Sequence, residues 1–248
     1  MQKKLTWVLA HEPYDLFLRA ASVFAKDIEQ GTNGRYSIDV IGLNEWNRRA
    51  SDNLTTHATD RERIISLVEN GMIDMATVYV NSLGKLDNNM WVLSMPFLFN
   101  DHEHASRVID GAIGRQLFAG LETKSKVHGL AFTYSGGYRV VPANFRADTV
   151  EAWQGQAVRT SRSPVAVDTF KLLGADPKEH IALEEMNEYA DRGEITAGES
   201  TYVRVFPLDQ YKSFKYVNDT AHSLFLTSII VNQDFFGEFS AEVQEILS

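Results

Sequence analysis

The residues with the clearest chemical potential in this sequence are arginines in an otherwise acidic chain. The formal net charge is −9, from 24 Lys and Arg against 33 Asp and Glu, so nucleic acid and anionic lipid are repelled at long range. A guanidinium can still bind a small anion, because its parallel N–H donors match the two oxygens of a carboxylate. Arg159 is a candidate, since Val158 precedes it and the polar Thr160–Ser161 follow, which places it at the carboxyl end of a strand. The alternative is an ordinary surface arginine.

Other chemistries find little support. The sequence has no cysteine, which excludes a disulfide scaffold, a cysteine nucleophile and thiolate metal ligands. His102 and His104 are spaced wrongly for two ligands on one helix face, and His11–Glu12 lacks the second histidine of a zinc protease motif. Glu184 and Glu185 are adjacent, so on a helix they diverge and do not form an acid–base pair. We therefore find no constellation of catalytic groups and expect no metal and no cofactor.

The composition predicts a folded protein of one large domain or two small ones. The chain has 248 residues, of which 44% are hydrophobic and 11% aromatic, enough for a sizeable core. No stretch approaches the ~20 apolar residues of a membrane span. The apolar run Leu5–Ala10 after Met1–Lys4 is too short for a signal peptide. It is predicted to be a first strand, and any export signal is expected not to be part of this sequence.

Hydrophobic spacing predicts a β-α-β-α-β order at the beginning of the chain. The predicted strands cover Leu5–Leu9, Tyr36–Val40 and Met72–Val80, and the predicted helices cover Tyr14–Gln30 and Arg61–Asn70. Residues 42–59 are expected to be irregular. This order favours a parallel sheet with right-handed crossovers.

A second α/β cycle is predicted after a long helix from Asp101 to about Lys124, interrupted near Gly111 and Gly114. The expected elements are strands at 129–134 and 138–143 joined by a Gly136–Gly137 turn, a strand at Val158, helices at 164–173 and 183–192, strands at 195–197 and 225–231, and a helix at 234–247. Two cycles without a flexible linker predict two lobes, residues 1–135 plus 224–248 and residues 136–223. The ligand is expected in a cleft between them, at the carboxyl ends of the strands.

Five local patterns occur in the order known from one family. They are Leu67–Met75 with its Gly-x-x-Asp step, Met95–Phe99 (similar to LPFLF), Gly137–Arg139 (G-x-R), Trp153–Arg159 (similar to LKGLKIR) and Asp168–Pro177 (F-x-x-L-G-A-x-P). Together, across residues 4–248, they resemble the DctP-type solute-binding proteins of TRAP transporters. The resemblance implies an α/β fold of the two-lobed periplasmic binding protein kind (type II-like), each lobe a sheet flanked by helices and joined by a strand and helix hinge.

The resemblance also implies roles for residues of the second lobe. Arg159 would form a bidentate salt bridge with the ligand carboxylate, and Arg139 would assist at the same carboxylate or at a hydroxyl. Glu199 is retained from the family's V-D-G-Q-E-N-P segment, whereas Ser200 stands where the family has a ligand-contacting Asn and Thr201 where it has Pro. Because a hydroxyl lacks the paired donor and acceptor of an amide, this departure bears on the ligand set more than on the fold.

Further ligand contacts are expected from loops, each with a structural alternative. They are His11, Glu12 and Tyr14 after the first strand, Tyr79 and Asn81 after the strand around Asp74, Leu183 where the family often has an aromatic residue, and Phe225, for which core packing is the alternative.

The implied function is capture of a small organic acid, a monocarboxylate or dicarboxylate that includes hydroxy and sugar acids. The two arginines and Ser200 favour a ligand with a further oxygen near its carboxylate. A periplasmic monomer would deliver this ligand to the small and large TRAP membrane subunits, with no nucleic-acid partner. Two alternatives remain, a binding protein that feeds a signalling receptor and an enzyme on the same scaffold. The chain also ends earlier than members of the family usually do.

Overall fold

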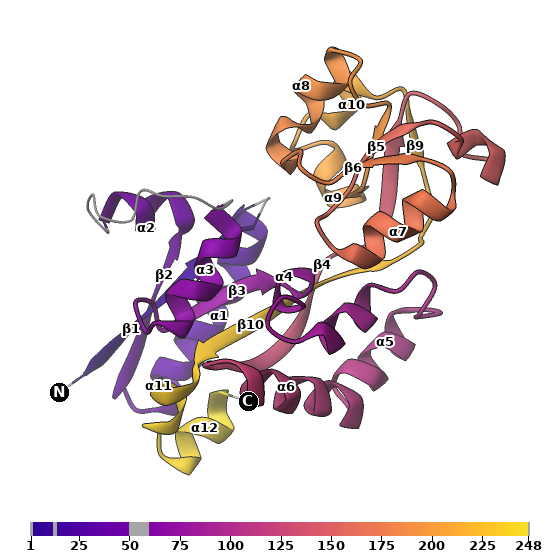
Figure 1. Cartoon of the computed structure of the whole chain (residues 1–248). Coiled ribbons are helices and arrows are strands. Elements are labelled where there is room, and N and C mark those ends of the chain that lie inside the picture. Colours follow the sequence, from indigo (N-terminus) through magenta and orange to yellow (C-terminus); the bar gives the residue numbers. More distant parts are fainter. Residues whose placement is uncertain (1, 12–13, 50–59, 248) are drawn as a thin grey trace. The chain divides into compact units, whose positions relative to one another are not determined.

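The computed structural model describes residues 2–11, 14–49 and 60–247, and it divides into two compact units. Unit 1 comprises Met1–Asn89, Arg107–Thr133 and Thr227–Ser248, and unit 2 comprises Met90–Ser106 and Tyr134–Leu226. Two long strands, β4 (Val127–Ala143) and β10 (Leu224–Asn232), contribute residues to both units (Figure 1). The lobe boundaries expected from the sequence stay a prediction. None of the helices within the described ranges is both long and apolar enough to cross a membrane.

Unit 1 is built on a sheet whose first three strands are parallel, as the hydrophobic spacing predicts. The central strand β1 (Lys3–Leu9) pairs in parallel with β2 (Tyr36–Gly42) and with β3 (Met75–Tyr79). Strand β10 runs antiparallel beside β3, and the order is β2-β1-β3-β10-β4. Residues of β1 such as Leu5, Trp7 and Leu9 are buried because helices cover the sheet.

Helix α1 (Tyr14–Gly31) covers this sheet with an apolar stripe of Phe17, Ala21 and Ile28. The helix ends where the sequence predicts, because Asn33 and Gly34 adopt the left-handed conformation that stops a helix. The other helices of the unit are α2 (Leu43–Arg49), α3 (Asp60–Glu69), α4 (Val80–Leu83), α6 (Ala112–Lys124), α11 (Gln233–Gly237) and α12 (Ala241–Leu247).

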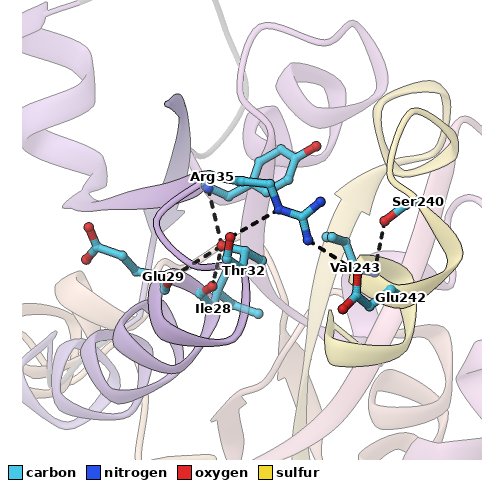
Figure 2. A network of polar contacts seen from close by, with 8 residues as sticks. Ile28, Glu29, Thr32, Arg35, Ser240, Glu242 and Val243 are labelled. Atoms are coloured by element: carbon cyan, nitrogen blue, oxygen red, sulfur yellow. Dashed lines mark hydrogen bonds and ion pairs between the residues drawn. The ribbon is translucent and has the colours of Figure 1, made fainter. Parts of the chain in front are cut away.

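The C-terminal helix α12 is held against the end of α1 by packing more than by charge. Figure 2 shows Arg35, whose Nε donates to the carbonyl of Thr32 at 3.1 Å and whose Nη2 lies 3.3 Å from Glu242 Oε2. Both charged side chains are mostly exposed, and such ion pairs contribute little. The buried Val243 and Leu247, which join the core of α1 and β1, therefore carry the attachment.

One sequence expectation about these elements is wrong, and another is confirmed in its interruption. The stretch expected to be irregular contains α2, in which Arg49 lies 2.8 Å from Asp39 of β2; residues 50–59 lie outside the described residues. The helix expected from Asp101 with an interruption near Gly111 and Gly114 is two helices, α5 (His102–Ile109) and α6, so the interruption is confirmed at Gly111. The boundary between the units lies within α5, since Ser106 belongs to unit 2 and Arg107 to unit 1. At Gly114 a Cβ would lie 1.7 Å from the carbonyl oxygen of Ile109, so the chain turns too tightly there for one continuous helix.

Strand β4 is another correction, because a hairpin was expected at Gly136–Gly137. Both glycines have positive φ values, +88° and +81°, yet the strand continues through them to Ala143. Glycine adopts such values without steric cost, so the pair bends the strand and does not reverse it. The expected helices at 183–192 and 234–247 are also each divided, into the 3-10 turn Leu183–Glu185 with α8 (Met186–Asp191), and into α11 with α12.

Unit 2 has a smaller mixed sheet. Strand β5 (Ala157–Arg159) is parallel to β6 (Asp176–Lys178) and to β7 (Ala197–Gly198). The second half of β4 pairs antiparallel with β7, β8 (Ser200–Thr201) and β9 (Tyr216–Asn218). Its further helices are α7 (Pro164–Leu172), α9 (Tyr202–Val205) and α10 (Gln210–Ser213).

The two faces of this sheet pack against different cores. The first, here called the Phe170 face, is formed by Val141, Ala143, Trp153, Val158, Phe170 and Ala197. The second, the Met186 face, is formed by Ile181, Leu183, Met186, Ala190, Ile195 and Phe214, with Ala157 packed against it. Because side chains alternate along a strand, Val158 belongs to the first face, and Ala157 and Arg159 belong to the second.

Candidate functional site

Polar side chains gather at the carboxyl ends of the parallel strands β5 and β7. Arg159, the last residue of β5, is in register with Gly198, the last residue of β7. The backbone N–H of Glu199 then donates to the carbonyl of Arg159 at 2.9 Å. This brings Arg159, Thr160, Glu199 and Ser200 to one edge of the sheet of unit 2, and this edge is where α/β folds bind ligands.

On the Phe170 face, a buried carboxylate organises a charged network. Glu199 Oε2 accepts hydrogen bonds from the hydroxyl of Thr160 and, at 3.1 Å, from the backbone N–H of Ser161. Glu199 Oε1 lies 3.1 Å from His222 Nε2 and 3.8 Å from Arg139 Nε. Burial raises the pKa of Glu199, but the charge of Arg139 and the contacts with His222 and Thr160 outweigh it and hold that pKa well below its usual range. Glu199 is therefore an anion at neutral pH.

Arg139 is fixed on two sides. Besides Glu199, its guanidinium carbon lies 4.0 Å from the centre of the Phe225 ring, and that of Arg204 lies 4.6 Å from the same ring. All three of these side chains are buried, and a desolvated cation–π contact contributes about 2 kcal/mol. Phe225, a candidate ligand contact from the sequence, thus packs against two guanidinium groups.

Arg159 lies on the other face of the sheet from Arg139. In the antiparallel register of β4 with β8, Arg139 is opposite Thr201, on the side of Glu199. Arg159 shares the Met186 face with Gly198, where an added Cβ would lie 3.4 Å from Arg159 Cβ. Its Nε donates to the carbonyl of Ile181 at 3.1 Å, which fixes the plane of the half-buried guanidinium. The structure therefore joins Arg139 to Glu199 and places Arg159 separately, at the same edge.

Two more candidates belong to the Met186 face. Leu183 is buried in the core of that face with Met186 and Phe214. Ser200 is fully buried, and its hydroxyl donates to Gln210 Oε1 at 2.6 Å. Sequence reasoning missed Gln210, His222 and the role of Thr160. Thr160 had a usable signal, since it directly follows Arg159, whereas Gln210 and His222 stand in no recognisable motif.

In unit 1 the candidate residues follow strands β1 and β3. The ring of His11 is buried, 4.6 Å from the ring of Phe17 and 4.2 Å from that of Tyr79, measured between ring centres. Tyr14 begins α1, and Asn81 lies in α4, immediately after β3. Their contact with a ligand stays a prediction, and Glu12 lies outside the described residues.

Two units built on sheets, with polar groups at the carboxyl ends of strands, are typical of solute-binding proteins. The sequence profile of the DctP family, described as "Bacterial extracellular solute-binding protein, family 7", matches residues 10–248. The chain belongs to this family, which confirms the resemblance found in the sequence. The family consists of periplasmic substrate-binding proteins and not of enzymes.

Individual relatives agree with this assignment. The chain is 24% identical over 229 residues to the C4-dicarboxylate-binding protein DctB of Bacillus subtilis, covering 92% of this chain and 61% of that protein. It is 30% identical over 187 residues to the 2,3-diketo-L-gulonate-binding periplasmic protein YiaO of Escherichia coli, covering 75% of this chain and 56% of that protein. The chain therefore spans less than two thirds of the length of these relatives.

The fold is that of known TRAP periplasmic solute-binding proteins. One such protein, from Xanthobacter autotrophicus Py2 with bound β-D-galacturonate, superposes with a TM-score of 0.81 at 24% identity, covering 98% of this chain and 76% of that one. The expected α/β, two-lobed binding-protein fold is confirmed by this likeness.

Proposed function

We propose that this protein is the solute-binding component of a TRAP transporter, which captures a small organic acid through Arg159 and delivers it to the membrane subunits. The observation that carries the proposal is the placement of Arg159 in a chain of the DctP family. Arg159 ends β5 at the carboxyl edge of the sheet, and its Nε is anchored to the carbonyl of Ile181. The family is described as extracellular solute-binding proteins, and we propose that this protein also acts outside the cytoplasm.

The anchoring of Nε has a geometric consequence for the ligand. With Nε donating to Ile181, a carboxylate would be met end-on by the two terminal nitrogens of Arg159. Such fork-like contacts are about twice as strong as hydrogen bonds between neutral groups. A lysine offers a point charge on a flexible stem and cannot reproduce the planar pair of donors. Arginine at this position therefore supports selection of carboxylates over neutral analogues.

Arg139 is proposed to have a supporting role. Its charge is balanced by Glu199, which limits its direct contribution to anion binding. The network that Glu199 makes with Thr160 and Ser161 holds the chain immediately after Arg159 in place. We propose that Glu199 acts through this chain segment as a positioning residue, and that His11, Tyr14, Tyr79 and Asn81 of unit 1 also contact the ligand.

The names of relatives support a ligand that carries oxygens beyond one carboxylate. The B. subtilis relative is named for C4-dicarboxylates, the E. coli relative for 2,3-diketo-L-gulonate, and the X. autotrophicus structure holds β-D-galacturonate. All three are organic acids, and the last two are sugar acids. We propose that the ligand of this protein belongs to the same chemical class.

The test is a thermal-shift screen of the purified protein against organic acids and their neutral amides. A true ligand at about one hundred times its dissociation constant adds roughly 2.7 kcal/mol to the free energy of unfolding. We expect stabilisation by an acid, none by its amide, and none in Arg159→Ala or Arg159→Lys. Arg146→Lys is the matched control, because Arg146 is exposed in the same unit and contacts only the Tyr216 ring at 5.5 Å among the interactions described. Equal stabilisation of Arg159→Lys and wild type would refute the proposal.

A further inference from the structure

A buried polar pair, Ser200 and Gln210, lies on the Met186 face of unit 2. Both side chains are essentially inaccessible, with 0% and 1% of their surface exposed. The Ser200 hydroxyl donates to Gln210 Oε1 at 2.6 Å. The amide nitrogen of Gln210 therefore keeps its own N–H donors, and within the described part of the chain it has no hydrogen-bond partner.

An amide without a partner is unusual at this depth. Most buried polar side-chain atoms are hydrogen-bonded, and leaving one unsatisfied costs about 1–3 kcal/mol. An apolar core lies close by, since Phe214, whose backbone N–H donates to the carbonyl of Gln210 at 3.0 Å, packs with Ile181, Leu183 and Met186. A leucine at position 210 would fill a similar volume without this penalty. A glutamine at this position is explained if its amide nitrogen donates a hydrogen bond to a molecule that is not part of the chain.

The pair lies next to Arg159. Arg159 is in register with Gly198 on the neighbouring strand, and Ser200 is two residues further along, on the same side of the sheet. Ala157, on the same side of β5 as Arg159, joins the same core as Phe214 after α10. The amide and the guanidinium therefore belong to one face and one edge.

This arrangement matches a small acid that carries a second oxygen. We propose that Gln210, oriented by Ser200, is a specificity-determining residue that donates a hydrogen bond to a hydroxyl or keto oxygen near the ligand carboxylate. The inference rests on the proposed function, in which Arg159 binds that carboxylate. A site with such a donor rejects an analogue that lacks the oxygen, because the buried amide is then left unpaired. The ligand class is therefore hydroxy or keto acids, in preference to their deoxy counterparts.

The experiment compares matched acids on the intact chain. Dissociation constants are measured by calorimetry for malate against succinate, lactate and pyruvate against propionate, and galacturonate against its deoxy analogues. We expect wild-type protein to prefer the oxygenated member by about tenfold or more, the effect of one lost hydrogen bond. Gln210→Leu should reduce this ratio toward one by weakening only the oxygenated acid. Ser200→Ala removes the hydroxyl that orients the Gln210 amide and should therefore reduce the ratio partly. This variant replaces Gln210→Leu in the test if Gln210→Leu does not fold.

The control is Gln154→Leu, since Gln154 is an exposed glutamine of the same unit whose amide donates to the carbonyl of Leu173. It should leave the ratio unchanged. If Gln210→Leu weakens both acids of a pair equally, or neither, while Arg159→Lys still abolishes binding, Gln210 holds only structural water and the inference is wrong. If no acid binds in preference to its amide and Arg159→Lys has no effect, the proposed function fails and the inference fails with it.

Discussion

Two buried polar side chains on opposite faces of the sheet in unit 2, Glu199 and Gln210, differ in how fully they are hydrogen-bonded. On the Phe170 face, Glu199 is surrounded by Arg139, His222, Thr160 and the backbone of Ser161, so that both carboxylate oxygens have partners. On the Met186 face, the amide nitrogen of Gln210 is buried without a partner in the described structure. A fully hydrogen-bonded network stabilises one conformation, whereas a buried donor without a partner can still donate a hydrogen bond to a ligand. The Glu199 network therefore stabilises the fold, whereas the Gln210 amide is available to bind a ligand.

The largest effect on the free energy of unfolding is expected from removing the carboxylate of Glu199. Glu199→Ala leaves Arg139 buried without its anionic partner, and breaking a buried ion pair costs about 3–5 kcal/mol of folding free energy. We expect the free energy of unfolding, measured by urea denaturation, to fall by that amount. Glu242→Gln in the exposed pair with Arg35 should change it by less than about 0.5 kcal/mol. An effect of Glu199→Ala as small as that control would contradict the scaffold role.

The pH dependence of the free energy of unfolding should reflect the ionisation of Glu199. The pKa of Glu199 is lowered in the folded protein from its usual value of 4.5, so the unfolded chain binds the proton more readily than the folded one. The stability that Glu199 contributes is complete above about pH 4.5 and is lost as the pH falls toward the lowered folded-state pKa.

This effect is measured by urea denaturation of wild type and Glu199→Gln between pH 7 and pH 3. The difference in unfolding free energy between them should shrink as the pH decreases, since glutamine does not titrate. Arg139 and His222, which both face Glu199, are present in both proteins. A difference that is constant with pH, or that grows at low pH, would show that the Glu199 carboxylate is not held as an anion.

The smallest effect on stability is expected on the Met186 face. The double variant Ser200→Ala with Gln210→Leu replaces both partners of a buried hydrogen bond by apolar groups and removes an unsatisfied amide. Such a replacement is nearly neutral or stabilising. We expect the unfolding free energy without ligand to stay within about 1 kcal/mol of wild type, or to increase. A loss of several kcal/mol would mean that the pair is a structural network like that of Glu199, and the contrast between the faces would disappear.

The local pattern of the sequence was a good guide to the first half of unit 1. The apolar spacing in Leu5–Leu9 and Tyr14–Gln30, and the turn at Asn33–Gly34, appear in the structure as β1, α1 and the end of that helix. Periodicity works here because burial of one side of a strand or helix imposes it directly. The placement of Arg159 at a strand end was readable for the same reason.

Predictions from the local sequence pattern were wrong where pairing with distant parts of the chain outweighs the conformational preference of a short segment. Gly136 and Gly137 have the composition of a turn, but pairing of β4 with β8 and β9 beyond them keeps the strand extended. Residues 183–192 were expected to form one helix, but the structure divides them into the 3-10 turn Leu183–Glu185 and α8. Turn and helix propensities amount to about 1 kcal/mol per residue or less, so tertiary packing overrides them.

By itself, the sequence determined the family, the α/β class and the arginine at the end of β5, because these depend on residue types and spacings that are read along the chain. Only the tertiary structure determined which side chains are hydrogen-bonded to one another. Thr160 and His222 reach Glu199 from 39 and 23 residues away, and Gln210 reaches Ser200 from 10 residues away. The register of β5 with β7 and of β4 with β8 then put Arg159 and Arg139 on opposite faces. Such pairings depend on how strands align, and a shift of one residue would exchange the two faces.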